Sequence, residues 1–172
     1  TQRNTKKDVT QISPVIDEAL KRMQEASGKQ GTSGVATGFH NLDKITSGWQ
    51  KSDLIIMAAR PAMGKTAFVL SMAKNMGVDH NTPVAVFSLE MSNVQLVNRL
   101  IQNVCELEGE KVKNGRLEPE EWNKLDQDIK ALIDAPIYVD DTPSLPVFEL
   151  RSKARRLVRE HNVQCIIIDY LQ

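Results

Sequence analysis

The stretch that decides the fold is Ala59-Arg60-Pro61-Ala62-Met63-Gly64-Lys65-Thr66. It follows an apolar run, Leu54 to Ala58, whose composition predicts a buried parallel strand. It precedes Ala67 to Ala73, which has the composition of a packed helix. A strand, a tight loop ending in Gly-Lys-Thr and a helix together form the layout of a phosphate-binding P-loop.

Each part of this loop has a physical task. Consecutive backbone N–H groups and the positive end of the helix dipole form a cradle for an anion. Gly64 lets the chain approach a phosphate closely, Lys65 can neutralise the outer phosphates, and the Thr66 hydroxyl can bind Mg²⁺. Ala59 replaces the glycine of the general pattern, which leaves a surface turn before an amphipathic helix as the alternative. The strand before the loop and the helix after it favour the P-loop.

The composition narrows the class of protein. The chain has 172 residues with 22 basic and 22 acidic side chains, so a bulk attraction to nucleic acid or membranes is not expected. Its apolar runs are too short to span a membrane, and its first residues lack a signal-peptide pattern. Cys105 and Cys165 lie within apolar patterns, which favours free buried thiols over a disulfide. We expect a soluble, cytoplasmic chain.

The N-terminal part predicts a helix on a flexible tether. Ser13-Pro14 is a good helix start, and an apolar stripe then runs to about Ala26. The glycine-rich segment 28–34 reads as a linker, so we divide the chain into residues 1–34 and a main domain of residues 35–172. The exposed stripe must be covered, either by the chain's own domain or by a neighbouring subunit. The residues alone do not favour one over the other.

The main domain alternates strands and helices. Apolar strands are expected at 84–88, 137–139 and 163–168 in addition to the P-loop strand, with helices starting near Ser92, Pro119 and Pro146. This alternation predicts an α/β fold with a mostly parallel sheet and helices on both faces. Since the chain stops just past the last strand, where such a sheet still needs further strands, we expect a domain truncated after that strand.

Two carboxylates follow predicted strands. Asp169 ends a run of isoleucines, which matches a Walker B carboxylate that supports Mg²⁺. Glu90 follows the strand 84–88 and is a candidate base for an attacking water, although a glutamate beside a helix-capping serine is also ordinary. Asp140 and Asp141 precede Thr142-Pro143, which suggests turn chemistry.

One predicted helix is strongly basic. We favour a solvated outer face over a nucleic-acid patch for this cluster. Its members are Arg151, Lys153, Arg155, Arg156 and Arg159.

Four motifs in order resemble a known family. They are Thr37-Gly38-Phe39 with Leu42-Asp43, the P-loop with its Ala-Arg-Pro start, Ser88-Leu89-Glu90-Met91, and Ile168-Asp169-Tyr170-Leu171-Gln172. Together they closely resemble DnaB-type replicative DNA helicases, from about Ser13 to Gln172. Many members of that family have serine at the position of Ala62, and that contact is made mainly through the backbone.

The resemblance implies a RecA-like ATPase domain that binds ATP and Mg²⁺ and works as a ring hexamer. Such a ring moves along single-stranded DNA in the five-prime to three-prime direction and unwinds the fork, with a primase and a helicase loader as partners. It also implies that the helix from Pro14 is a linker helix that packs on the adjacent subunit. The glutamine switch, the DNA-binding loops and the arginine finger of the family follow the Walker B strand, so we expect little ATPase activity from this chain alone.

The resemblance also assigns roles to individual residues. Lys65 and Glu90 are catalytic, and Thr66 and Asp169 bind the metal. Arg99 corresponds to a family arginine that helps to hold the nucleotide. The nucleotide-binding set is Ala59, Arg60, Pro61, Ala62, Met63, Gly64, Lys65, Thr66, Ala67 and Arg99.

Two other functions share some of these features. One is a recombination or clock ATPase of the RecA and KaiC type, against which the Ser-Leu-Glu-Met segment and Tyr170-Leu171-Gln172 speak. The other is a nucleotide-binding assembly module that oligomerises without turning over ATP.

Overall fold

The computed structural model describes residues 11–27 and 32–170 of the chain. Its helices are α1 (Ile12–Ser27), α2 (His40–Thr46), α3 (Lys65–Lys74), α4 (Asn93–Cys105), α5 (Gly109–Asn114), α6 (Pro119–Ile133) and α7 (Val147–His161). A π-helical segment, Asn75–Asp79, continues α3. The strands are β1 (Val84–Ser88), β2 (Ile137–Asp140) and β3 (Cys165–Asp169).

The described strands form a parallel sheet in the order β2-β1-β3. Val84 lies opposite Ile137 on one side and Cys165 on the other, and Ser88 lies opposite Asp169. All five residues of β1 are buried because the strand has a neighbour on each edge and helices on each face. The predicted α/β class and the strands after the P-loop are therefore confirmed.

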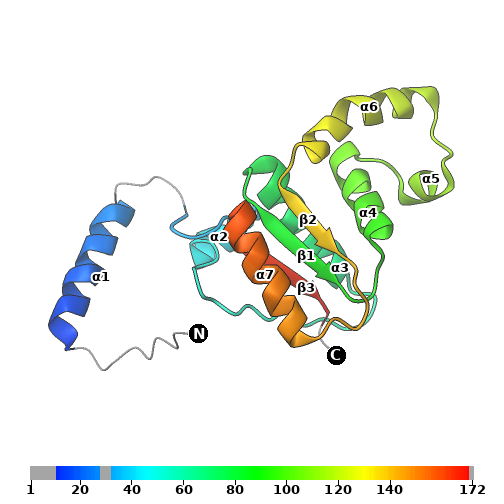
Figure 1. Cartoon of the computed structure of the whole chain (residues 1–172). Coiled ribbons are helices and arrows are strands. Elements are labelled where there is room, and N and C mark those ends of the chain that lie inside the picture. The colour runs from blue at the N-terminus through cyan, green and yellow to red at the C-terminus, as the bar shows by residue number, and fades with distance from the viewer. Residues whose placement is uncertain (1–10, 28–31, 171–172) are drawn as a thin grey trace.

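Helices cover both faces of the sheet (Figure 1). On one face, α3 and α4 pack through Leu70, Leu96 and Leu100 against Val84 and Val86 of β1. On the other face, α7 packs on Ala85 and Phe87, with Leu150 and Leu157 pointing to the sheet. Successive side chains of a strand point to opposite faces of the sheet, so Val84 and Val86 lie on one face of β1 and Ala85 and Phe87 on the other.

The predicted P-loop strand is wrong in this structure. Residues 54–58 have no regular secondary structure, so the described sheet has three strands where four were expected. The exposed fractions alternate along the segment, with Leu54 at 86%, Ile55 at 45%, Ile56 at 82% and Met57 at 37%. An apolar composition favours burial, but a strand also requires a partner for its backbone, and no described strand pairs with this segment.

Several helix predictions need smaller corrections. The helix start expected near Ser92 is confirmed, and it is closed by a capping box in which Gln95 N donates to Ser92 Oγ and Ser92 N donates to Gln95 Oε1. The short helix α5 was not predicted. Five apolar residues that helical periodicity places on the inward stripes of their helices are instead exposed, because the neighbouring elements leave these positions uncovered: Val97, Trp122, Ile133, Val147 and Val158.

Helix α1 leaves its apolar stripe exposed. Ile12, Val15, Ile16, Leu20 and Met23 are all exposed, and Figure 1 shows α1 standing apart from the sheet. The described chain therefore does not cover this stripe itself. Of the predicted linker 28–34, residues 28–31 lie outside the described residues, whereas Gly34 N donates to Ser47 O at 2.9 Å and so is tied to the main domain.

Two further sequence expectations concern cysteines and membranes. Both cysteines are free thiols, with Cys105 buried and Cys165 half-buried, and burial raises the pKa of Cys165 to about 11. Among the described residues, no helix is long and apolar enough to cross a bilayer.

A buried carboxylate holds the segment that leads to the P-loop. Asp43 of α2 accepts hydrogen bonds from Thr37 N at 2.8 Å, Thr37 Oγ1 at 2.7 Å and Gly38 N at 3.0 Å. Phe39 stacks on Phe68 of α3 with ring centroids 4.6 Å apart. The Thr37-Gly38-Phe39 and Leu42-Asp43 motif is thus a structural unit that fixes α2 against α3.

Gly38 provides a test of this packing. Its φ is +78°, and a Cβ there would collide with the Cβ of Asn75. Gly115 has a φ of +65° but open space around it. Both alanine variants incur the backbone strain of about 1 kcal/mol, so we expect Gly38→Ala to lower the free energy of unfolding by about 1–3 kcal/mol more than Gly115→Ala. Urea denaturation measures both, and equal losses would show that Gly38 does not pack closely on Asn75.

Candidate functional site

The P-loop presents an open cradle in front of α3. Met63 N donates to Arg60 O at 3.3 Å, and Gly64, in the left-handed conformation with φ +83°, is the residue that caps α3. A methyl group on Gly64 would meet no described atom within 4 Å. The first N–H groups of a helix have no partner within it, so those of α3 are available to an anion. The exposed residues 59–64 leave the site accessible.

Asp169 contacts both polar side chains at the start of α3. Thr66 Oγ1 donates to Asp169 Oδ2 at 2.7 Å, and Lys65 Nζ lies 3.2 Å from Asp169 Oδ1. The Asp169 side chain is only 6% exposed, whereas that of Lys65 is 27% exposed. The structure thus brings together the lysine, the threonine and the aspartate that the sequence singled out, although they come from distant parts of the chain.

The parallel register explains this convergence. β1 and β3 end at the same edge of the sheet, where Leu89 N donates to Asp169 O at 2.8 Å. The carboxyl ends of parallel strands and the N-termini of the following helices meet at one edge, which is where open α/β sheets bind ligands. A shift of β3 by one residue would turn Asp169 to the opposite face of the sheet.

Glu90 and Arg99 are less closely tied to this cluster. Glu90 lies in the turn after β1, where Met91 N donates to Ser88 Oγ at 2.9 Å, and its side chain is exposed. Arg99 lies on α4 and is exposed. Neither side chain makes a hydrogen bond or ion pair with the residues that the structure describes. Glu90 is nevertheless only one residue from the backbone contact between Leu89 and Asp169.

Tyr170 lies next to the site, although the sequence analysis assigned it no functional role. Its ring lies under the Lys65 ammonium, with Nζ 4.0 Å from the ring centroid. An aromatic face attracts a cation, so Tyr170 helps to orient Lys65. The signal that could have found it is an aromatic residue directly after the strand-end carboxylate.

The donor set fits a magnesium ion that is held jointly with phosphates. Within the described part of the chain, no group of three or more His, Cys, Asp or Glu side chains could hold a metal alone. Mg²⁺ usually keeps several waters and uses one or two protein oxygens together with substrate phosphates. Thr66 Oγ1 and Asp169 Oδ2 are two such oxygens, side by side.

Asp140 and Asp141 have structural partners, as their turn sequence suggested. Asp140 accepts from Thr142 N at 2.9 Å and from Lys153 Nζ at 2.7 Å. Partial burial acts to raise the pKa of Asp140, but these hydrogen bonds outweigh it and hold the pKa below its usual value. Asp141 Oδ2 accepts from Asn93 N at 2.8 Å and so helps to cap α4.

Most of the chain matches a known protein family. Residues 34–172 match the family described as the DnaB-like helicase C terminal domain.

Three curated relatives are similar along nearly the whole chain. The replicative DNA helicase DnaB of Geobacillus stearothermophilus is 44% identical over 94% of this chain, and the replicative DNA helicase DnaC of Bacillus subtilis is 40% identical over 99%. The replicative DNA helicase DnaB of a Nostoc species is 42% identical over 100%. The chain spans 36%, 38% and 20% of the lengths of these relatives, respectively.

Two solved structures are similar to the fold. One is a structure of an ATPase domain, which aligns with a TM-score of 0.86 and 32% identity, over 95% of this chain and 58% of that one. The other is a DnaB-like replicative helicase, studied with its interactions with primase, which aligns with a TM-score of 0.81 and 32% identity, over 95% of this chain and 39% of that one.

Proposed function

Because the chain belongs to the DnaB-like helicase C-terminal domain family, we propose that it forms the ATP-binding part of a replicative DNA helicase. The observation that carries this proposal is the contact of Asp169 with both Thr66 and Lys65 in front of α3. An anion cradle, a lysine ammonium and two oxygens for Mg²⁺ are the parts that a nucleoside triphosphate requires. The P-loop backbone from Ala59 to Ala67 would follow the phosphates.

Nucleotide binding exchanges partners at this site. In the structure, Asp169 satisfies Lys65 and the Thr66 hydroxyl. When a triphosphate occupies the cradle, Lys65 turns to the outer phosphates, and Thr66 and Asp169 are free to hold Mg²⁺. The bound Mg²⁺ supplies neutralisation of the phosphate charge. The exchange has a small free-energy cost because each polar group keeps a charged partner. A buried carboxylate such as Asp169 requires a partner of this kind.

We also propose roles for Glu90 in activating water and for Arg99 in contacting the nucleotide. Glu90 accepts a proton from, or orients, the water that attacks the terminal phosphate. Its exposed position at the end of β1, adjacent to the Leu89 contact with Asp169, leaves the carboxylate accessible to such a water. Arg99 reaches the nucleotide from α4.

At the level of the whole helicase, ATP hydrolysis drives five-prime to three-prime movement on single-stranded DNA in the cytoplasm. The exposed apolar stripe of α1 supports a homohexamer in which this helix packs on the adjacent subunit. A primase and a helicase loader are the proposed partners. The primase is supported by a similar DnaB-like helicase that was studied with its interactions with primase.

The Lys65 assignment is tested by Lys65→Ala. A charge-assisted hydrogen bond to phosphate contributes about 1.5–3 kcal/mol. We therefore expect the dissociation constant of a fluorescent ATP analogue, measured by anisotropy with Mg²⁺, to rise about 10- to 100-fold. Lys51→Ala removes an exposed lysine in the turn before the P-loop segment and should leave the affinity unchanged. Unchanged affinity in Lys65→Ala would exclude this cradle as the phosphate site.

The Glu90 assignment is tested by Glu90→Gln in the complete helicase, because little turnover is expected from this chain alone. The substitution keeps the size of the side chain and removes its basicity. We expect affinity for the ATP analogue within about twofold of the original and turnover lower by about 10²- to 10⁴-fold, the usual contribution of a general base. Glu120→Gln, an exposed glutamate on α6, is the matched control. Turnover that survives Glu90→Gln means that another group activates the water. Binding without turnover in the complete protein favours a nucleotide-dependent assembly module.

The role of α1 is tested by placing charges on its exposed stripe. Ile16→Glu with Leu20→Glu removes two apolar side chains whose burial contributes about 1.5–3 kcal/mol each. We expect sedimentation equilibrium to show a shift toward monomers. Lys21→Glu changes charge on the same helix without touching the stripe and should leave the association intact. Association that is identical in all three proteins would exclude α1 as the subunit contact.

A further inference from the structure

Helix α7 has two distinct faces. Its inner face packs on β1 through Leu150 and Leu157. Successive residues of an α-helix are turned by about 100° from one another. Phe148, Arg155 and Arg159 therefore lie opposite the inner pair, whereas Val147, Arg151 and Val158 lie on one flank between the two faces.

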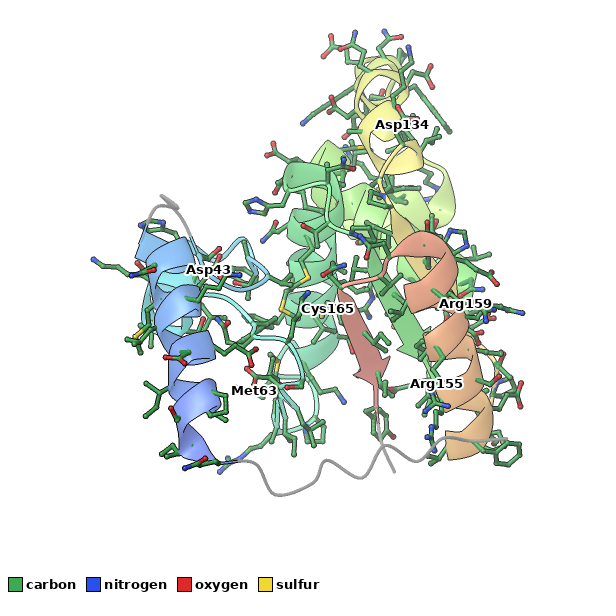
Figure 2. All side chains as sticks on the ribbon, turned by 60° about the vertical axis from the view of Figure 1, so that its left-hand side comes forward. Asp43, Met63, Asp134, Arg155, Arg159 and Cys165 are labelled. Atoms are coloured by element: carbon green, nitrogen blue, oxygen red, sulfur yellow. The ribbon has the colours of Figure 1, made fainter. Side chains whose placement is uncertain are left out.

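The outer face and this flank together carry a stripe of exposed arginine and apolar side chains, which we call the α7 outer stripe. Val147 and Phe148 are each 77% exposed and Val158 is 48% exposed. The arginines are also exposed. Spacings of three and four residues bring these side chains side by side along the helix. The stripe consists of Val147, Phe148, Arg151, Arg155, Val158 and Arg159, the last of which is labelled with Arg155 in Figure 2.

The positive charge of the stripe is not balanced within the described chain. Arg151 and Arg155 make no hydrogen bond or ion pair with the described residues, and Arg159 pairs only with the adjacent Glu160, at 3.3 Å and with both side chains exposed. Lys153, which the sequence grouped with these arginines, points elsewhere and bonds Asp140 and Thr142. Because the whole chain has zero net charge, this stripe is a local concentration of positive charge.

The mixed character of the stripe distinguishes between classes of partner. The phosphates of a nucleic acid backbone can pair with the arginines, but they cannot cover the exposed valines with apolar surface. An amphipathic protein segment can cover Phe148 and the valines with apolar side chains while its flanking carboxylates meet the arginines. Aromatic residues and arginine are also the side chains that contribute most at protein interfaces.

We propose that the α7 outer stripe is a docking surface for an acidic amphipathic helix of another protein. Phe148 is the apolar anchor, and Arg151 and Arg155 pair with carboxylates beside it. The surface lies on the face of the sheet that α7 covers, whereas the P-loop helix α3 packs on the opposite face (Figure 1). The inference is therefore independent of the proposed ATP site.

The test uses a fluorescein-labelled designed peptide that forms a helix with leucines on one face and glutamates beside them. A scrambled peptide of the same composition, which has no apolar face, and a labelled oligothymidine are compared with it. We expect anisotropy to report binding of the designed peptide at least about tenfold tighter than that of either comparison molecule. Binding should weaken as salt is raised, because the arginine contacts are screened.

Matched variants assign the binding to the stripe. Phe148→Ala and the pair Arg151→Glu with Arg155→Glu should each weaken binding at least about tenfold. Ile133→Ala and Arg116→Glu, which change an exposed apolar and an exposed basic residue elsewhere, should not. All variants should keep the original affinity for the ATP analogue, which shows that they fold and that a failure here is separate from a failure of the ATP site.

Three outcomes overturn the proposal. The first is equal binding of the designed and scrambled peptides, or no binding of either. The second is tighter binding of the oligothymidine that depends on the arginines and not on Phe148, which makes the stripe a nucleic-acid surface. The third is self-association of the chain that the stripe variants abolish, which makes a second copy the occupant.

Discussion

The contact between Asp169 and the first turn of α3 is the interaction on which the functional part of the structure depends. It joins residues 103 positions apart, with Thr66 Oγ1 2.7 Å from Asp169 Oδ2. A carboxylate that is 6% exposed is expensive to bury without partners, and here the hydroxyl and the Lys65 ammonium supply them. The same three groups are the ones that a metal-bound triphosphate requires, so the site is held together by the chemistry that nucleotide binding would use.

The scaffold around this contact fixes its geometry from two directions. The register of β1 and β3 sets the position of Asp169, and the packing of α3 on β1 sets the position of Thr66. Asp43 adds a third constraint, because its hydrogen bonds to Thr37 and Gly38 hold α2, while Phe39 stacks on Phe68 of α3. The motif before the P-loop is therefore part of the support of the site, even though none of its residues is predicted to touch the nucleotide.

Sequence reasoning was most successful where local and long-range requirements agree. Val84 to Ser88 and Ile166 to Asp169 are apolar runs that the sequence predicts as strands and the structure pairs in parallel, so Ser88 and Asp169 lie at the same edge of the sheet. It was wrong at residues 54–58, because composition specifies a preference for burial and not the presence of a pairing strand. Trp122 and Val158 are exposed for a related reason: periodicity identifies an apolar stripe, while the neighbours that cover it are set by the tertiary fold. The Tyr170 contact with Lys65 depends on side-chain geometry that no spacing rule contains.

A double-mutant cycle on Thr66→Val and Asp169→Ala tests the central contact most directly. Urea unfolding of the original chain, the two single variants and the double variant, all without nucleotide, gives the coupling free energy between the two side chains. A charge-assisted hydrogen bond at this distance predicts a coupling of about 1 kcal/mol or more. Losses that add to within about 0.3 kcal/mol would show that the two side chains do not interact, and the account of the site given above would then be wrong.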